Sequence, residues 1–417
     1  MNYTNNRMNI NTTHYKQKKM KRLFFLVVSV VLFIFGALTT SARTTVIISL
    51  DGFRWDYPHM YHTPFFDRLA QEGIEAEMMP SFPSKTFPNH YTLATGLYPD
   101  HHGLIDNRFY DQKSGLIYSI GDVKTKSDPR FYGGEPIWIT AHKQGKKTGV
   151  VYWPGSDVAI QGQYPDYYQN YDKAPRLTFA ERIVEVERLL KLPEDKRPQL
   201  VMAYFEEPDH SGHTYGPTAP ETRKAVEQMD VLLEQLYNDI RALPYGKDIN
   251  FIVTADHGMA TTSPERLIHL SSYLKKEWTT RIMTSLPTLI YPAKGCTEKI
   301  MKALQQVPHL RVWKKEDVPS FLHYGSNANI AAIVALPDVG WIIKEGNEVI
   351  PGNHGYDPTS SDMHVMFRAA GPDFKKGYHM THTFSNVNVY SLLAKLIGIT
   401  PAPNDGNVDN VKELLAQ

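Results

Sequence analysis

The apolar residues of this chain form two kinds of segment that alternate along it. One kind is a short, continuous apolar run rich in β-branched residues. Because such a run is apolar at every position rather than at every second one, it predicts a strand buried on both faces of a sheet. The runs are Thr45–Leu50, Thr148–Trp153, Leu200–Phe205 and Ile249–Thr254, and Met363–Ala369 is expected to be a further strand of the sheet.

In the other kind of segment, apolar residues recur at every third or fourth position, which is the spacing of one buried helix face. Pro220–Leu243, Phe179–Leu192 and Asn388–Ile397 have this pattern. A shorter helix is predicted to run to about Thr95 with Thr86 at its amino end, because Pro88 suits its first turn and Gly96 follows its last. Strands that alternate with helices predict an α/β fold, with a mainly parallel central sheet and helices on both faces.

The pattern loosens between about residues 267 and 351, where prolines and glycines mark frequent turns. We interpret this stretch as a small subdomain, inserted before the chain returns to the sheet. With 417 residues, of which 42% are hydrophobic, the chain is long enough to bury a large core. Residues 43–417 are therefore expected to form one domain that carries this insertion.

The first 42 residues are interpreted as an N-terminal extension with a signal peptide. Lys21-Arg22 precede the apolar run Leu23–Leu38, and the small residues Thr40-Ser41-Ala42 follow it. A basic flank, about 16 apolar residues and a small-residue site are typical of a secretory signal, with Met20 competing with Met1 as the start. An uncleaved membrane anchor is the alternative, although the run is slightly short for a span. Either way, we expect the body of the chain to leave the cytoplasm.

Cysteine content and net charge indicate the cellular compartment and the class of partner. Cys296 is the only cysteine, so no disulfide can form within the chain, and this favours a bacterial periplasm over a eukaryotic extracellular space. The formal net charge of +1 gives no reason to propose nucleic acid as a long-range electrostatic partner. We expect a periplasmic or secreted protein whose partner is a small molecule.

Acidic residues and histidines follow three of the predicted strands. Asp51 follows the first strand, Asp209 and His213 follow the third, and Asp256-His257 follow the fourth. Parallel strands place their carboxyl ends along one edge of a sheet, where open α/β sheets bind ligands, so these residues are expected to converge on the loops there. His354, in a glycine-rich loop, is a further candidate.

Each of these residues also has an ordinary interpretation. An aspartate after a strand is often a turn former or a helix cap, and a single histidine is more often packed or solvated than bound to a metal. Hard and borderline metal ions, however, take Asp and His as ligands, and the repetition at several strand ends favours a metal site.

Thr86 is the candidate nucleophile. It stands at the amino end of the helix predicted from Pro88, where unpaired N–H groups and the positive end of the helix dipole favour phosphate and a developing alkoxide. A simple helix cap is the alternative role. A threonine hydroxyl is a poor nucleophile until its pKa is lowered, and a bound metal can do this.

Together these segments resemble the nucleotide pyrophosphatase/phosphodiesterase family of the alkaline phosphatase superfamily. The resemblance covers essentially the whole body of the chain, in the same linear order. It implies an alkaline-phosphatase-like α/β core, two zinc ions and a threonine nucleophile. The segments that carry it are Asp51, Lys85–His90, Glu207–Pro217, Asp256–Met259 and Asn353–Gly355.

The resemblance also implies roles for single residues. Asn107 matches the asparagine that donates to a phosphoryl oxygen, against a simple turn residue as the alternative. An Asp and His ligand set without cysteine suits zinc and leaves manganese, iron or cobalt open. The implied ligands are Asp209, His213 and His354 for one ion, and Asp51, Asp256, His257 and Thr86 for the other.

The implied reaction has two steps, in which Thr86 first forms a phosphothreonine and water then releases the product. Phe87, Tyr204 and Tyr171 lie near the motifs, where aromatic residues stack a base in nucleotide-hydrolysing members; ordinary core packing is the alternative for each. We therefore expect hydrolysis of nucleotide phosphodiester or pyrophosphate bonds, with release of a nucleoside 5′-monophosphate.

Other substrates stay open at this point. Lipid or choline phosphodiesters, phosphate monoesters and phosphonates are handled on related scaffolds. The neutral Asn107, without an obvious arginine or third-metal cluster, favours a diester over a monoester dianion. A sulfatase is less favoured because the chain has no Cys/Ser-x-Pro-x-Arg segment. A non-catalytic exported binding protein is opposed by the intact Thr86 and the full ligand set.

Overall fold

A computed structural model of the chain describes residues 43–416. The predicted signal peptide, its membrane-anchor alternative and the choice between Met1 and Met20 lie outside these residues. Within the described range, the protein has no helix that is long and apolar enough to cross a membrane.

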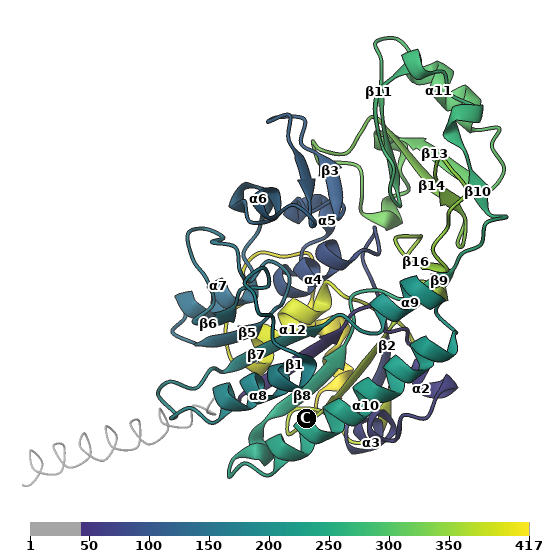
Figure 1. Ribbon diagram of the computed structural model, residues 1–417. Coiled ribbons are helices and arrows are strands. Elements are labelled where there is room, and N and C mark those ends of the chain that lie inside the picture. The colour runs from purple at the N-terminus through teal and green to yellow at the C-terminus, as the bar shows by residue number, and fades with distance from the viewer. Residues whose placement is uncertain (1–42, 417) are drawn as a thin grey trace, which may run out of the picture. The chain divides into compact units, whose positions relative to one another are not determined.

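The central element is a nine-stranded sheet with the order β18-β2-β17-β8-β1-β7-β5-β6 and with β19 beside β2 (Figure 1). β17 runs antiparallel to both of its neighbours, whereas the other pairs are parallel. The strands are β1 (Thr45–Leu50), β2 (Ile74–Met79), β5 (Thr148–Val151), β6 (Tyr167–Gln169), β7 (Leu200–Phe205), β8 (Asn250–Thr254), β17 (Val365–Ala370), β18 (Tyr378–His379) and β19 (Phe384–Ser385).

The continuous apolar runs occupy the buried centre of this sheet. β1, β7 and β8 are buried at every residue, and Thr45 lies opposite both Leu200 and Asn250 in the parallel register. All five predicted strands are present. β5 ends at Val151, earlier than predicted, because Tyr152 turns the chain with a positive φ of 61°.

Helices pack on both faces of the sheet, as their periodicity predicted (Figure 1). One face carries α3 (Pro64–Glu72), α8 (Phe179–Leu190) and α10 (Pro220–Arg241), and the other carries α4 (Thr86–Thr95), α7 (Ile137–Lys143) and α12 (Asn388–Leu396). As predicted, α4 begins at Thr86 with Pro88 in its first turn, and it ends where Gly96 takes a positive φ of 68°.

After β8 the chain leaves the main sheet and builds a second lobe before it returns. This lobe holds a four-stranded antiparallel sheet of order β11-β12-β14-β13, against which α11 packs around a separate apolar cluster (Figure 1, upper right). Two short strand pairs, β9 with β16 and β10 with β15, join the outgoing and returning chain. The elements are β9 (Ala260–Thr261), β10 (Leu267–Ile268), β11 (Thr279–Met283), β12 (Thr288–Pro292), α11 (Thr297–Leu304), β13 (Leu310–Lys314), β14 (Ile333–Pro337), β15 (Ile342–Ile343) and β16 (Gly352–Asn353).

The expectation that Asp209 and His213 lie on a loop after β7 was wrong. Shortly after this strand the chain forms the helix α9 (Asp209–Tyr215), whose first turn is closed by a 2.8 Å hydrogen bond from the Gly212 N–H to the Pro208 carbonyl. Residues four apart lie on one side of a helix, so α9 presents Asp209 and His213 together.

Candidate active site

Two clusters of Asp and His side chains meet at the carboxyl edge of the central strands. The first joins Asp209 and His213 of α9 to His354, which follows β16. Asp209 Oδ1 lies 3.4 Å from His213 Nε2 and 3.6 Å from His354 Nε2. One ligand atom from each of the three lies within 4.8 Å of the others, so the structure brings the first predicted ligand set together.

The second cluster joins the ends of β1 and β8 to the start of α4. His257 Nε2 lies 3.3 Å from Asp51 Oδ1, 3.1 Å from Asp256 Oδ2 and 3.2 Å from Thr86 Oγ1. The second predicted set is therefore also together. Ligand atoms of Asp51, Asp209 and His257 lie within 4.8 Å of one another, which means that the two clusters adjoin.

Backbone carbonyls fix the orientation of all three histidines. Each ring directs Nδ1 at a carbonyl oxygen, at 2.8 Å for His213, 2.8 Å for His354 and 2.9 Å for His257. Because a carbonyl only accepts, Nδ1 carries the proton and Nε2 presents its lone pair to the clusters. Metal-binding histidines are held in this way.

The acceptor atoms of the two clusters are short of donors. Asp51 Oδ1, Asp209 Oδ1 and Asp256 Oδ2 are buried with no hydrogen-bond partner in the described part of the chain. The Nε2 atoms of His213 and His354 face each other at 3.1 Å. Buried acceptors arranged like this repel one another and are costly to leave unsatisfied. Divalent cations would satisfy them, so the residues fit a pair of metal ions.

Burial and neighbouring charges shift the pKa values of three of these groups. Burial, together with the charges of Asp256 and Asp209, raises the pKa of Asp51. Burial also raises the pKa of Asp209 to about 6 and lowers the pKa of His257 to about 4. A bound cation would lower the two carboxyl pKa values again, and the neutral form of His257 is the form that ligates.

Thr86 adjoins the second cluster, and Asn107 is held beside it. It is the first residue of α4, and the N–H of the next residue, Phe87, donates to Asn107 Oδ1 at 2.9 Å. This bond occupies the side-chain oxygen of Asn107, so the amide N–H groups on Nδ2 are left to donate to a ligand. The orientation suits a donor to a phosphoryl oxygen.

A buried lysine beside the nucleophile was not expected. Lys85 is 9% exposed, and burial lowers its pKa while the charges of Asp106 and Asp209 act in the opposite direction. Gly355 makes room for it, since a Cβ there would lie 2.4 Å from Lys85 Cε. Its place in the sequence, directly before Thr86, is the signal that could have indicated this extra positive charge.

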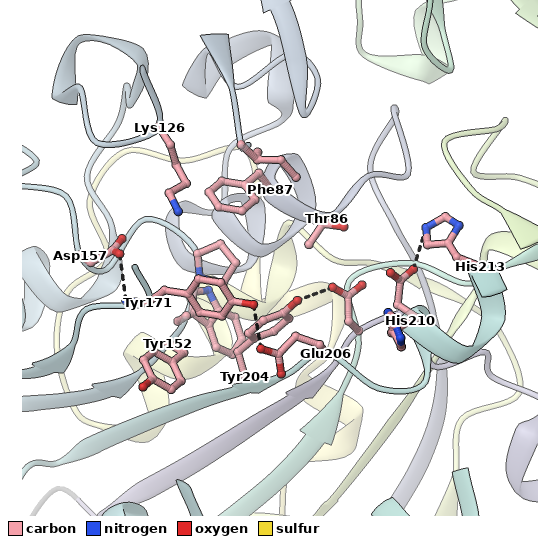
Figure 2. Close-up of a pocket in the computed structure, with 15 residues that line it drawn as sticks. Thr86, Phe87, Lys126, Tyr152, Asp157, Tyr171, Tyr204, Glu206, His210 and His213 are labelled. Carbon is pink, nitrogen blue, oxygen red and sulfur yellow. Dashed lines mark hydrogen bonds and ion pairs between the residues drawn. The ribbon is translucent and has the colours of Figure 1, made fainter. Parts of the chain in front are cut away.

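A cavity of about 310 Å³ opens beside Thr86. Figure 2 shows the aromatic side chains Phe87, Tyr171 and Tyr204 on one side of Thr86 and His213 on the other. Lys126 lies on the aromatic side, away from His213 (Figure 2). The aromatic cavity thus lies directly beside Thr86 and the Asp/His clusters.

The two tyrosines of this cavity have different partners. Tyr171 donates its hydroxyl to Glu206 at 2.8 Å, and the buried Arg182 holds the same carboxylate at 2.7 Å. Tyr204 is 7% exposed and donates its hydroxyl to Asp51 Oδ2 at 2.6 Å (Figure 2). The ring of Tyr204 lines the cavity, but its hydroxyl acts on a carboxylate of the second cluster.

Arg182 and Lys126 are functional neighbours that the sequence did not single out. Arg182 belongs to α8, and Lys126 ends the short helix α6 (Val123–Lys126). Both are buried and form ion pairs, Arg182 with Glu206 and Lys126 with Asp172. Neither lies in a motif, so only the tertiary structure places Lys126 in the cavity lining and Arg182 on the lining residue Glu206.

Comparison with known proteins agrees with this geometry. The family model described as type I phosphodiesterase/nucleotide pyrophosphatase matches residues 45–357. Human ectonucleotide pyrophosphatase/phosphodiesterase family member 5 is 35% identical over 401 residues, which cover 94% of this chain and 83% of that protein. Human family member 1 is 36% identical over 389 residues, which cover 89% of this chain and 42% of that protein. The chain thus spans less than half the length of the second relative.

A solved structure confirms the predicted α/β fold. An inactive threonine-to-alanine variant of murine family member 5, in complex with AMP, matches with a TM-score of 0.85 at 34% identity, covering 90% of this chain and 100% of that one. The family model and the relatives span most of the described residues, including both clusters. The chain belongs to the type I phosphodiesterase/nucleotide pyrophosphatase family.

Proposed function

We propose that this protein hydrolyses phosphodiester and pyrophosphate bonds of nucleotides and releases nucleoside 5′-monophosphates through a phosphothreonine at Thr86. The position of Thr86 Oγ1 carries the proposal. It lies at the amino end of α4, 3.2 Å from His257 Nε2, where the two Asp/His clusters adjoin. A nucleophile, a cation site and an apolar cavity thus share one edge of the sheet.

We propose two zinc ions as cofactors, with other divalent transition metals as alternatives. Bound at the clusters, such a pair would supply positive charge that lowers the pKa of a hydroxyl and stabilises the negative charge that develops during the displacement. The residues that would hold one ion are Asp209, His213 and His354, and those that would hold the other are Asp51, Asp256, His257 and Thr86.

The chain's own residues set the course of the reaction. Thr86 Oγ1 loses its proton and bonds to phosphorus while the bond from phosphorus to the leaving oxygen breaks, the leaving oxygen takes up a proton, and the configuration at phosphorus inverts. The N–H groups and dipole of α4 favour the negative charge that develops at Oγ1. Asn107, held by the N–H of Phe87, donates Nδ2 to a phosphoryl oxygen. Water then attacks phosphorus, the bond to Thr86 Oγ1 breaks, and the configuration inverts a second time.

The cavity beside Thr86 supports a nucleotide as the substrate. Phe87 and Tyr171 offer aromatic surface on which a base can stack, and the bond from Tyr171 to Glu206 fixes one of the rings. The structural relative that was solved with AMP supports the same ligand class.

A phosphate monoester is the second candidate. The buried Lys85 favours it, because a further cation near the phosphate stabilises the additional charge of a monoester dianion. Lipid or choline phosphodiesters and phosphonates remain alternative substrates. A non-catalytic binding protein is opposed by the position of Thr86 within a complete ligand set.

Paired substrates test the diester assignment. The p-nitrophenyl ester of thymidine 5′-monophosphate should be cleaved much faster than p-nitrophenyl phosphate, and EDTA should abolish this activity until zinc is added back. Initial rates at several substrate concentrations provide the comparison. Faster cleavage of the monoester would overturn the diester assignment in favour of the second candidate.

Thr86→Ala tests the nucleophile. We expect this variant to retain zinc and to lose turnover by at least about 1,000-fold, because the attacking oxygen is gone. Thr86→Ser keeps a hydroxyl at the same place and should retain measurable activity. Zinc content and kcat are measured on both variants, and undiminished turnover in Thr86→Ala would refute the assigned role.

We also propose that the body of the chain is exported, either to a periplasm or as a secreted protein. The basic, apolar and small-residue pattern at residues 21–42 supports this, as do the relatives named ectonucleotide enzymes. Cell fractionation of the tagged full chain, with sequencing of its N-terminus, separates a cleaved signal from a retained anchor. Recovery of the uncleaved chain in the cytosol would contradict export.

A further inference from the structure

His90 lies behind the second cluster, one helical turn after Thr86, and is fully buried. Its Nδ1 faces the carbonyl oxygen of Thr86 at 2.9 Å and Asp256 Oδ2 at 3.3 Å. On the other side of the ring, Nε2 lies 2.8 Å from the hydroxyl of Ser49. Because a carbonyl and a carboxylate both accept, Nδ1 carries the proton, and the Ser49 hydroxyl is free to donate to Nε2.

One N–H group therefore faces both the backbone of the nucleophilic residue and a proposed metal ligand. Asp256 Oδ2 is one of the buried carboxylate oxygens without a hydrogen-bond partner, and it lies 3.1 Å from His257 Nε2. The imidazole itself is held edge-to-face by two rings, with centroid distances of 5.2 Å to Trp153 and 4.9 Å to Tyr204. Ser49, Trp153 and Tyr204 thus fix the ring, and with it the direction of the N–H group.

We infer that His90 is a positioning residue that holds Asp256 and the first turn of α4 together, so that Asp256 and Thr86 meet at one cation. This inference rests on the proposed function, since it assigns His90 a role towards the proposed metal site. A side chain that orients a ligand from behind typically changes metal affinity or activity by about 10- to 100-fold when it is removed. A buried histidine that only fills space would affect folding stability instead.

Two variants separate positioning from packing. His90→Asn keeps an amide donor where Nδ1 lies, whereas His90→Gln places its amide nearer to Nε2 and Ser49. Both variants lose the imidazole ring and its contacts with Trp153 and Tyr204, so they share any loss that comes from packing. They differ in the donor that faces Thr86 and Asp256.

The experiment uses the full chain. For each variant we would measure zinc affinity by competition with a chelator, the thermal midpoint with and without zinc, and kcat and KM on the p-nitrophenyl diester. His90→Gln should lower zinc affinity and kcat by about 10- to 100-fold and reduce the zinc-induced rise in the midpoint. His90→Asn should stay within about threefold of the wild type in zinc affinity, and KM should change by less than about twofold in both.

Different results would contradict the role of His90 and the proposed function. Equal losses in the two variants, or a His90→Gln protein with wild-type zinc affinity and kcat, overturn the inference. If His90→Gln does not fold, His90→Asn decides, and a zinc affinity more than about tenfold below that of the wild type then overturns it. Failure of the proposed function looks different, because wild-type activity would then survive both EDTA and Thr86→Ala.

Discussion

At the scale of single residues, the partner of a side chain decides its role more than its type does. Tyr204 was predicted to stack a base because it is an aromatic residue near the motifs. In the fold it lies opposite Ser49 in the β1–β7 register, and its hydroxyl reaches Asp51. The strand was predictable from its apolar run. The register, which places the Tyr204 hydroxyl beside Asp51, was not.

Tyr204→Phe distinguishes these two roles, because it removes the hydroxyl and keeps the ring. We expect kcat on the p-nitrophenyl diester to fall about tenfold through loss of support for Asp51, with KM little changed. Phe87→Ala is the contrasting variant and should mainly raise KM, because it removes stacking surface. A Tyr204→Phe protein that behaves like the wild type would contradict the role of the hydroxyl.

Most of the candidate ligands could be predicted because they follow parallel strands or lie in a segment that resembles the family. The carboxyl ends of β1 and β8 are neighbours in any sheet that pairs these strands in parallel, which brings Asp51 and Asp256 together. His90 and Arg182 extend from helices, and the direction of a helical side chain depends on how the whole helix packs. Their roles therefore became visible only in the fold.

At the scale of elements, α3 begins without a cap of its own. Thr63 at its N-cap position makes no side-chain hydrogen bond. Instead, Asp230 of α10 accepts the N–H groups of Phe65 at 3.1 Å and Phe66 at 2.8 Å. Periodicity predicted α10 and its buried face, but no local rule links α10 to the start of a helix that lies far earlier in the chain.

Asp230→Ala tests this cap between helices. The free energy of unfolding should fall by about 2 kcal/mol, because buried N–H groups of α3 lose their acceptor. Thr178→Ala, at the exposed capping box of α8, is the matched control and should lower it by about 1 kcal/mol. Urea unfolding of the zinc-loaded proteins gives both values. A smaller loss in Asp230→Ala than in the control would contradict the cap.

At the scale of the whole molecule, the proposed ligands come from segments far apart in the chain. We propose that residues 43–417 form one catalytic domain with a subdomain inserted at about residues 267–351, where frequent turns interrupt the alternating pattern. The pairs β9–β16 and β10–β15, which bring the outgoing and returning chain together, support this proposal. The turns indicated an insertion, but the pairing in its sheet is between distant strands and has no local signature.

Metal removal should therefore destabilise the entire domain. Zinc at about a thousandfold excess over its Kd should add about 4 kcal/mol to the free energy of unfolding, and EDTA should remove this gain. Calorimetry with zinc and with EDTA measures the change in thermal midpoint. A double variant, Asp256→Ala with His354→Ala, should respond far less, and an undiminished response would contradict the assigned ligands.

The return of the chain through β16 has a consequence for biosynthesis. Asp51, Thr86, Asp256 and His257 have all been synthesised before the second lobe begins, whereas His354 follows directly after β16, at the end of that lobe. Early synthesis of these residues does not complete their cluster, because the loop that carries Asp256 and His257 is held by a later segment: the Gly258 N–H donates to the Met363 carbonyl at 2.9 Å. Asp209 and His213 likewise need His354, so a chain that stops before about residue 364 lacks the support of the loop that carries two proposed ligands, and one that stops before His354 lacks a third ligand as well.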